Sequence, residues 1–137
     1  MAWSILISNR KLALEGLGAL LLLMFSTVAP VSAGAGNPKH KITVTFNYDF
    51  SATPACSSIH DSKCVEEFVL YDISAGVAKR TELLAIPVPS QPHGFVKGIS
   101  ATTAPLLFES GKHFLALVAR TPDRTESRAA TVWVTIP

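Results

Sequence analysis

The sequences FLALVA at residues 114–119 and TVWVTI at residues 131–136 decide the fold of this chain. The first is a continuous apolar run of strand length, which is typical of a strand covered on both faces. The second alternates small polar with large apolar residues, as expected for a strand buried on one face. Residues 120–128 between them are rich in turn formers and charge. The two segments therefore predict a β-hairpin packed over a core.

Other strand candidates precede this hairpin. Residues 41–50 alternate perfectly, with Ile, Val, Phe, Tyr and Phe on one face and polar side chains on the other. Gly98 predicts a β-bulge, and the prolines that end the segment 81–88 mark it as an edge strand. About six or seven short strands, with no helical periodicity after residue 33, predict an all-β sandwich. The remaining candidate strands are residues 65–74, 94–103 and 106–108.

Several of these segments resemble the fibronectin type III domain, a member of the immunoglobulin-like superfamily. The resemblance rests on Ile42–Phe46, Phe68–Asp72, Gly111–Val118 and Asp123–Ser127, which match the second, third and sixth strands of that family and the turn before its last strand. It implies a seven-strand sandwich over residues 41–137. Another immunoglobulin-like sandwich is the alternative interpretation.

The first strand of that family is expected to be short or missing. Residues 34–40 have little strand character and are predicted to form a flexible leader. A sandwich without this strand would expose an edge of unpaired backbone groups that another chain could complete.

The N-terminal region has the order of a secretory signal. Arg10 and Lys11 precede the apolar segment Leu17–Ala29, and small residues follow at 32–34. Residues 1–33 are therefore predicted to be a helical signal peptide, cleaved after Ala33, which would make the protein secreted, periplasmic or extracellular. An uncleaved anchor is the alternative, although the apolar segment Leu17–Ala29 is shorter than the roughly 20 mainly apolar residues of a spanning helix. Only in that case is contact with a membrane expected.

The predicted mature chain, residues 34–137, has 104 residues, a usual size for one β-sandwich. The whole sequence has 12 basic and 10 acidic residues, and loss of Arg10, Lys11 and Glu15 leaves ten against nine. This balance argues against a nucleic-acid partner, since such partners need a dense basic patch.

Both cysteines lie in the predicted exported part. Cys56 and Cys64 bracket much of the polar loop 51–63, and an exported pair of thiols is expected to form a disulfide bond. The closed loop would stabilise the fold by about 2 to 3 kcal/mol. A metal site is the alternative, but a second pair of ligands at matching spacing is missing from the sequence.

No catalytic constellation is visible in the sequence. His60 beside Asp61 suggests a general base, yet neighbouring loop residues rarely reach the required geometry, and no nucleophile turn accompanies them. The histidines show no zinc-ligand spacing either. We therefore expect no enzyme activity, cofactor or metal. The four histidines are His40, His60, His93 and His113.

Four residues of the final hairpin are candidates for binding. Arg120, Arg124 and Arg128 surround its turn, where they could form a basic cluster, although acidic residues of the same turn, Asp123 and Glu126, are expected to neutralise it. Trp133 has the opposite parity to the expected core residues of its strand. Its ring is thus expected on the outer face, available to a ligand or covering the sheet edge.

These features predict a non-catalytic protein-interaction or adhesion module that contacts another protein or a cell-surface glycan. A small carbohydrate-binding protein that uses Trp133 or Tyr71 as a platform is the alternative. A small secreted hydrolase is the third interpretation, and it would require chemistry at His60 or Asp61.

Overall fold

The computed structural model describes residues 21–31, 39–52, 64–90 and 92–137. This part of the chain is built from strands and two short 3-10 turns, and it contains no α-helix. The prediction of an all-β sandwich is confirmed. The elements are β1 (Leu21–Val31), β2 (Lys39–Asp49), η1 (Phe50–Ala52), β3 (Glu67–Asp72), η2 (Val77–Lys79), β4 (Thr81–Pro87), β5 (Phe95–Thr102), β6 (Leu106–Leu107), β7 (Gly111–Arg120) and β8 (Ala130–Ile136).

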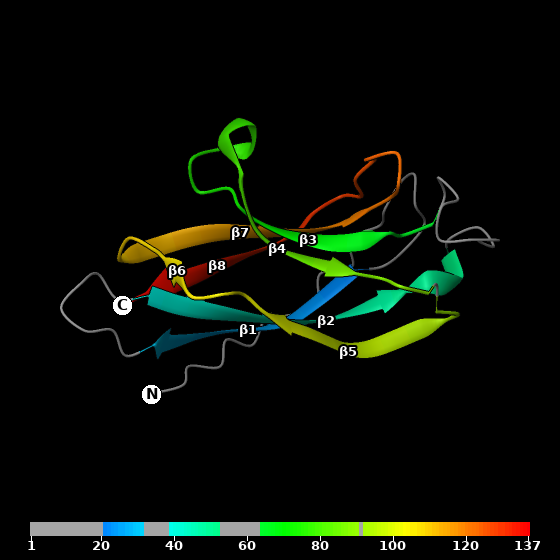
Figure 1. Cartoon of the computed structure of the whole chain (residues 1–137), viewed down its shortest axis with the longest axis horizontal. Helices are drawn as coiled ribbons and strands as arrows, with labels where there is room; N and C mark the ends of the chain where they lie inside the picture. The colour runs from blue at the N-terminus through cyan, green and yellow to red at the C-terminus, as the bar shows by residue number, and fades with distance from the viewer. Residues whose placement is uncertain (1–20, 32–38, 53–63, 91) are drawn as a thin grey trace.

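The strands form two antiparallel sheets that lie face to face (Figure 1). The first sheet has the order β1-β2-β5, and the short β6 also pairs with β2. The second sheet has the order β4-β3-β7-β8. β2 is therefore the central strand of one sheet, while β3 and β7 are central in the other.

The predicted hairpin is β7 and β8, and both burial patterns are as expected. Leu115 and Leu117 of β7 face the core between the sheets, while Val118 is buried on the opposite face against Val69 and Tyr71. β8 alternates strictly between buried and exposed positions. A strand that is buried on both faces thus lies beside one that is buried on a single face. The core residues of β8 are Ala130, Val132, Val134 and Ile136.

An aromatic cluster joins the two sheets where β2 ends and β3 begins. The rings of Phe46 and Tyr48 on β2 meet the ring of Phe68 on β3 edge to face, with centroids 4.8 and 4.9 Å apart. Phe50 adds a further ring 4.6 Å from Tyr48. Such edge-to-face pairs are each worth about 0.5–1.5 kcal/mol beyond the burial of their area. Burial raises the pKa of the Tyr48 hydroxyl, which has no hydrogen-bond partner among the described residues.

The predicted irregularity at Gly98 is also confirmed. The register between β2 and β5 shifts between Phe46 and Tyr48, and Gly98 has a φ of 69°. Its backbone N–H donates to Asn47 Oδ1 at 2.9 Å, so the buried amide of Asn47 has a partner at the bulge. β4 is an edge strand, as its prolines predicted.

The prediction of a helical signal segment is wrong over Leu21–Val31. These residues form β1, which pairs antiparallel with β2. The first strand of the sandwich is therefore present, and it comes from upstream of the expected leader. Leucine and methionine favour a helix locally, but the ladder offered by β2 decides the conformation. The predicted leader also ends earlier than expected, since Lys39 and His40 belong to β2.

Candidate binding face

The exposed aromatic residue predicted on β8 lies on the outer face of the second sheet. Trp133 is 57% exposed, and its ring stacks on that of Phe114 from the paired position of β7. The ring centroids are 4.4 Å apart and the planes differ by 18°. Each ring therefore covers one face of the other, and Trp133 leaves apolar ring surface exposed to solvent on the outer face.

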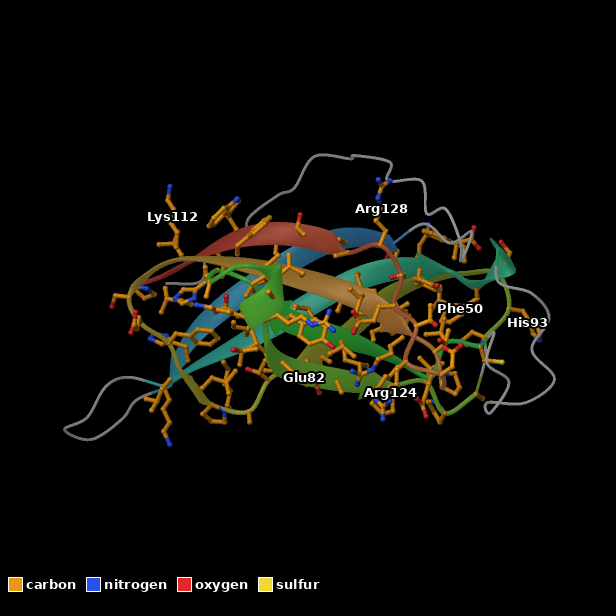
Figure 2. All side chains as sticks on the ribbon, turned by 90° about the horizontal axis from the view of Figure 1, so that it is seen from above. Phe50, Glu82, His93, Lys112, Arg124 and Arg128 are labelled. Atoms are coloured by element: carbon orange, nitrogen blue, oxygen red, sulfur yellow. The ribbon has the colours of Figure 1, made fainter. Side chains whose placement is uncertain are left out.

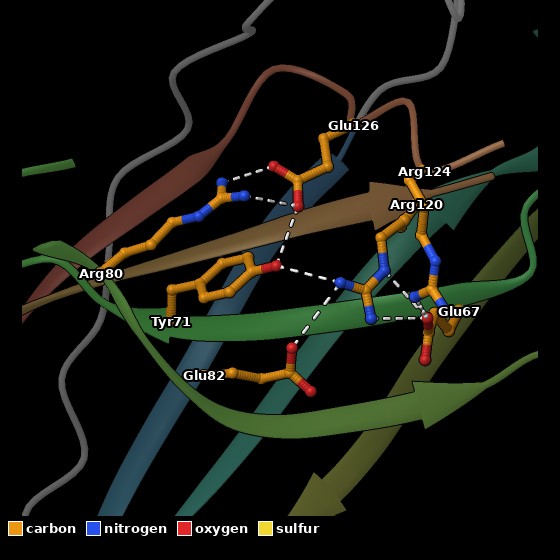
Figure 3. Close-up of polar contacts among 7 residues, drawn as sticks. All are labelled: Glu67, Tyr71, Arg80, Glu82, Arg120, Arg124 and Glu126. Atoms are coloured by element: carbon orange, nitrogen blue, oxygen red, sulfur yellow. Dashed lines mark hydrogen bonds and ion pairs between the residues drawn. The ribbon is translucent and has the colours of Figure 1, made fainter. Parts of the chain in front are cut away.

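A polar network lies on the same face around Arg120 (Figure 3). The Arg120 guanidinium donates to Glu67 Oε1 from Nε at 2.9 Å and from Nη2 at 2.6 Å, and to the Tyr71 hydroxyl at 3.2 Å. Glu82 approaches the same guanidinium at 3.6 Å. Burial alone would lower the pKa of Arg120, but the hydrogen bonds and charge of Glu67 outweigh it and raise the pKa. The network fixes Arg120 as a charged residue between three strands.

Arg80 closes the network on its other side. Its guanidinium forms a bidentate pair with Glu126, with hydrogen bonds of 2.5 and 3.1 Å, and lies 4.3 Å from the centroid of the Tyr71 ring. Tyr71 donates its hydroxyl to the same Glu126 carboxylate at 2.8 Å. Tyr71 is only 4% exposed beneath these groups. The interpretation of Tyr71 as a sugar platform is therefore wrong.

The network and the aromatic pair are neighbours on one face. Tyr71 pairs with Ala116 on β7, and Phe114 lies two residues from Ala116 on that strand. Residues two apart along a strand point to the same face of a sheet. The outer face of the second sheet thus carries the Trp133 and Phe114 rings and also, over Tyr71, the partly exposed cation of Arg80. We call this surface the β8 face.

The predicted cluster of three arginines is not formed. Arg120 is held against β3, while Arg124 and Arg128 project on opposite sides of the β7–β8 pair (Figure 2). The loop acid Asp123 accepts from Thr121 and Thr125 within the turn, and Arg124 instead contacts Glu67 at 3.3 Å. Glu126 does neutralise an arginine, but that arginine is Arg80. Strand β3 therefore supplies the main counter-charge that the sequence analysis assigned to the loop.

A second polar group joins Asp72 and His113. His113 Nδ1 lies 2.8 Å from Asp72 Oδ2, and Nε2 lies 2.8 Å from the Glu109 carbonyl oxygen. Both partners can only accept, so each ring nitrogen carries a proton when both bonds form. Burial acts to lower the pKa of His113, but the Glu109 carbonyl and Asp72 together raise it. Both contacts thus favour the protonated imidazole, which would form an ion pair with Asp72.

This group does not have the geometry of a hydrolase triad. Ser74 donates its hydroxyl to Asp72 Oδ1 at 2.5 Å and accepts the backbone N–H of Phe114 at 2.8 Å, so the serine contacts the carboxylate and not the imidazole. Neither nitrogen of His113 is available as a base. Burial would raise the pKa of Asp72, but its bonds from Ser74 and His113 lower it. The arrangement closes the β3 end against β7 and has a structural role.

The remaining predicted residues fall partly outside the described chain. His60, Asp61 and Cys56 lie among residues 53–63, so the disulfide bond stays a prediction; Cys64 is fully buried. Within the described ranges, no group of three or more metal-ligating side chains is close enough to hold a metal ion. In the same part of the chain, no helix has the length and apolarity needed to cross a membrane.

Comparisons with protein-family models, curated proteins and solved structures found no match for this chain. The site is therefore argued from its geometry alone. Sequence reasoning found Trp133 through the parity of its strand, but it missed Phe114, Glu67, Arg80 and Glu82. Phe114 had a detectable signal, because it follows the same parity as the outer residues of β7. The other three come from strands and turns far away in sequence.

Replacement of Arg120 tests whether the network stabilises the fold. We expect Arg120→Met to lower the free energy of unfolding by about 2 kcal/mol, because Glu67 and Tyr71 would lose charge-assisted bonds at a partly buried site. Arg124→Met is the matched control, since that side chain is 68% exposed, and its loss should stay within about 0.5 kcal/mol. Urea unfolding measures both. Equal losses for the two variants would contradict a structural role for Arg120.

The Asp72–His113 pair predicts a pH dependence of stability. A raised His113 pKa gives a contribution that is complete below the unfolded value of about 6.5 and lost as pH rises through the folded value. A lowered Asp72 pKa gives one that is complete above about 3.9 and lost as pH falls through the folded value. The stability difference between wild type and His113→Gln should thus be largest between these limits.

Urea unfolding of both proteins over a pH series measures this difference. The Val77→Ala variant, altered at an exposed residue without a titrating group, serves as the control and should show a constant difference from wild type. A flat profile for His113→Gln would show that the imidazole is not charged in the folded protein.

Proposed function

We propose that this chain is a non-catalytic interaction module whose binding surface is the β8 face. The observation that carries the proposal is the Trp133 ring, which is 57% exposed and held flat by Phe114. Binding energy at protein interfaces concentrates on tryptophan, tyrosine and arginine anchors. Trp133 is an anchor of this kind, and its stacked ring costs little side-chain entropy when a partner binds.

The organisation of the sheets supports a fibronectin-type-III-like module. The strand orders β1-β2-β5 and β4-β3-β7-β8 place three strands against four, and the network around Arg120 gives the outer surface a rigid base. In such a family the fold is a scaffold, and function resides in the surface presented by strands and loops. We therefore assign partner contact to the β8 face and a structural role to the Asp72–His113 pair.

Carbohydrate binding is the second candidate. An exposed indole face is suited to stacking against the apolar face of a sugar ring, and Trp133, held in place by Phe114, offers such a ring. The partner in the two proposals differs, a protein in the first and a cell-surface glycan in the second, but the anchoring residue is the same.

Substitution of Trp133 tests both candidates. We expect Trp133→Ala to abolish retention of the partner from envelope and secreted fractions, with a loss of stability of only about 1 kcal/mol, because the ring covers little of the core. Val77→Ala removes another exposed apolar side chain, on η2, and should retain the partner. Glycan arrays with the same variants separate the two candidates. Undiminished binding by Trp133→Ala would contradict the assignment of the β8 face.

We further propose that the protein is exported, with cleavage after Ala33 and a bond between Cys56 and Cys64. Full burial of Cys64 is consistent with a cysteine that serves the structure. N-terminal sequencing of the exported protein should begin at Gly34, and its intact mass should be two hydrogens below that of the reduced form. An N-terminus upstream of residue 21 would contradict cleavage. Alkylation of Cys56 without prior reduction would contradict the bond.

A further inference from the structure

Strand β1 covers one entire edge of β2. Its register runs from Leu21 opposite Tyr48 to Val31 opposite Lys39, with an irregularity between Leu23 and Phe25. The other edge of β2 is occupied by β5 and, near its start, by β6. β1 also approaches β8, so that it lies at the side where the two sheets meet. With β1 in place, both edges of β2 are paired.

The residues of β1 are also the apolar part of the predicted signal peptide. Cleavage after Ala33, as proposed above, separates Leu21–Val31 from the rest of the sandwich. The mature chain then contains the acceptor edge of β2 without the strand that completes it. The present inference rests on that proposed cleavage for its role in the cell, while the acceptor property of the edge does not depend on it.

An unpaired β2 edge would lower the free energy of unfolding of the sandwich. Backbone N–H and C=O groups along Lys39–Tyr48 would lose their ladder partners, and an open edge pairs readily with other strands. The core residues Ile42 and Val44, which are fully buried in the complete sandwich, would lose the strand beside them. Completion by another strand restores both the ladder and the burial.

We propose that the outer edge of β2 is an acceptor site for an extended strand of another protein. The strand now present defines the chemistry of the occupant, since Leu21–Val31 contains no charged residue and pairs antiparallel over its whole length. The partner therefore offers about ten uncharged, mainly apolar residues in extended conformation. A second mature copy does not supply this strand, because cleavage removes it from every copy. The site is separate from the β8 face, which faces outward from the other sheet.

A strand-exchange experiment tests the acceptor site in the full chain. A protease recognition sequence is inserted between Ala33 and Gly34, and the folded protein is cut in the presence of excess labelled Leu21–Val31 peptide with a lysine tail outside the paired residues. Incubation in urea below the unfolding midpoint accelerates release of the resident strand. We expect the anisotropy of the label to rise and to saturate at one peptide per chain, with the resident strand released.

The matched control is a peptide that carries both Thr27→Pro and Val28→Pro. Ladder bonds to one neighbour alternate along a strand, so two adjacent prolines remove a donor whichever residue points to β2. We expect at least about tenfold weaker binding from the loss of that bond and the surrounding geometry.

Three results would overturn the proposal. The first is a cut chain that stays folded and takes up no labelled peptide. The second is equal uptake of the double-proline peptide, which would show non-specific apolar binding. The third is a dimer formed through two open β2 edges in native mass spectrometry, with the peptide excluded. None of these results depends on Trp133 or on export, so they are distinguishable from a failure of the proposed function.

Discussion

The packing of β2 against β3 is the contact on which the rest of the structure depends. Phe46 and Tyr48 pack edge to face against Phe68, and these three rings join the two sheets within a core that also contains aliphatic residues of both. Each sheet is otherwise held by its own backbone ladder, which gives no preference for the relative position of the two layers. The aromatic contact fixes that position. The apolar alternation of β8 determines which of its faces turns to this core.

The outer face of the second sheet carries a second, smaller apolar cluster, which polar side chains help to cover. Central strands β3 and β7 carry apolar residues on both faces, so Val69 and Val118 need cover on the side away from the core. Tyr71 and the loop after β7 supply part of that cover, because the Tyr71 hydroxyl donates to Glu126 of the loop while Arg120 donates to Glu67 and Tyr71 of β3. The charged side chains of this network therefore help to keep Val69 and Val118 covered. This explains why most of the arginines near the turn are not free to bind a ligand, while the aromatic pair at the other end remains exposed.

Sequence patterns predicted those features that a single strand carries within itself. The alternation in β2 and β8 gave their buried faces and the exposure of Trp133, and Gly98 marked its bulge, because strand periodicity encodes the face of each residue directly. The pairing of Arg120 with Glu67 and of His113 with Asp72 joins residues 53 and 41 positions apart, and nothing local indicates it. The predicted arginine cluster was wrong for this reason, because the counter-charge of Arg120 comes from Glu67, which is distant in sequence.

The prediction of a helix over Leu21–Val31 was wrong for a more informative reason. Leu21–Val31 satisfies two physical descriptions at once, since an uncharged apolar segment suits the core of a signal peptide and also the edge of an apolar sheet. Local composition does not choose between them, because the choice depends on what surrounds the segment: lipid and the export machinery in one case, the ladder of β2 in the other. In the sandwich, the backbone ladder between β1 and β2 holds Leu21–Val31 in the extended conformation. The ladder that joins β2 to its partner is made of backbone groups, so another uncharged, mainly apolar strand can form the same ladder. The same property that misled the sequence analysis is therefore the property that makes the β2 edge able to accept a strand from elsewhere.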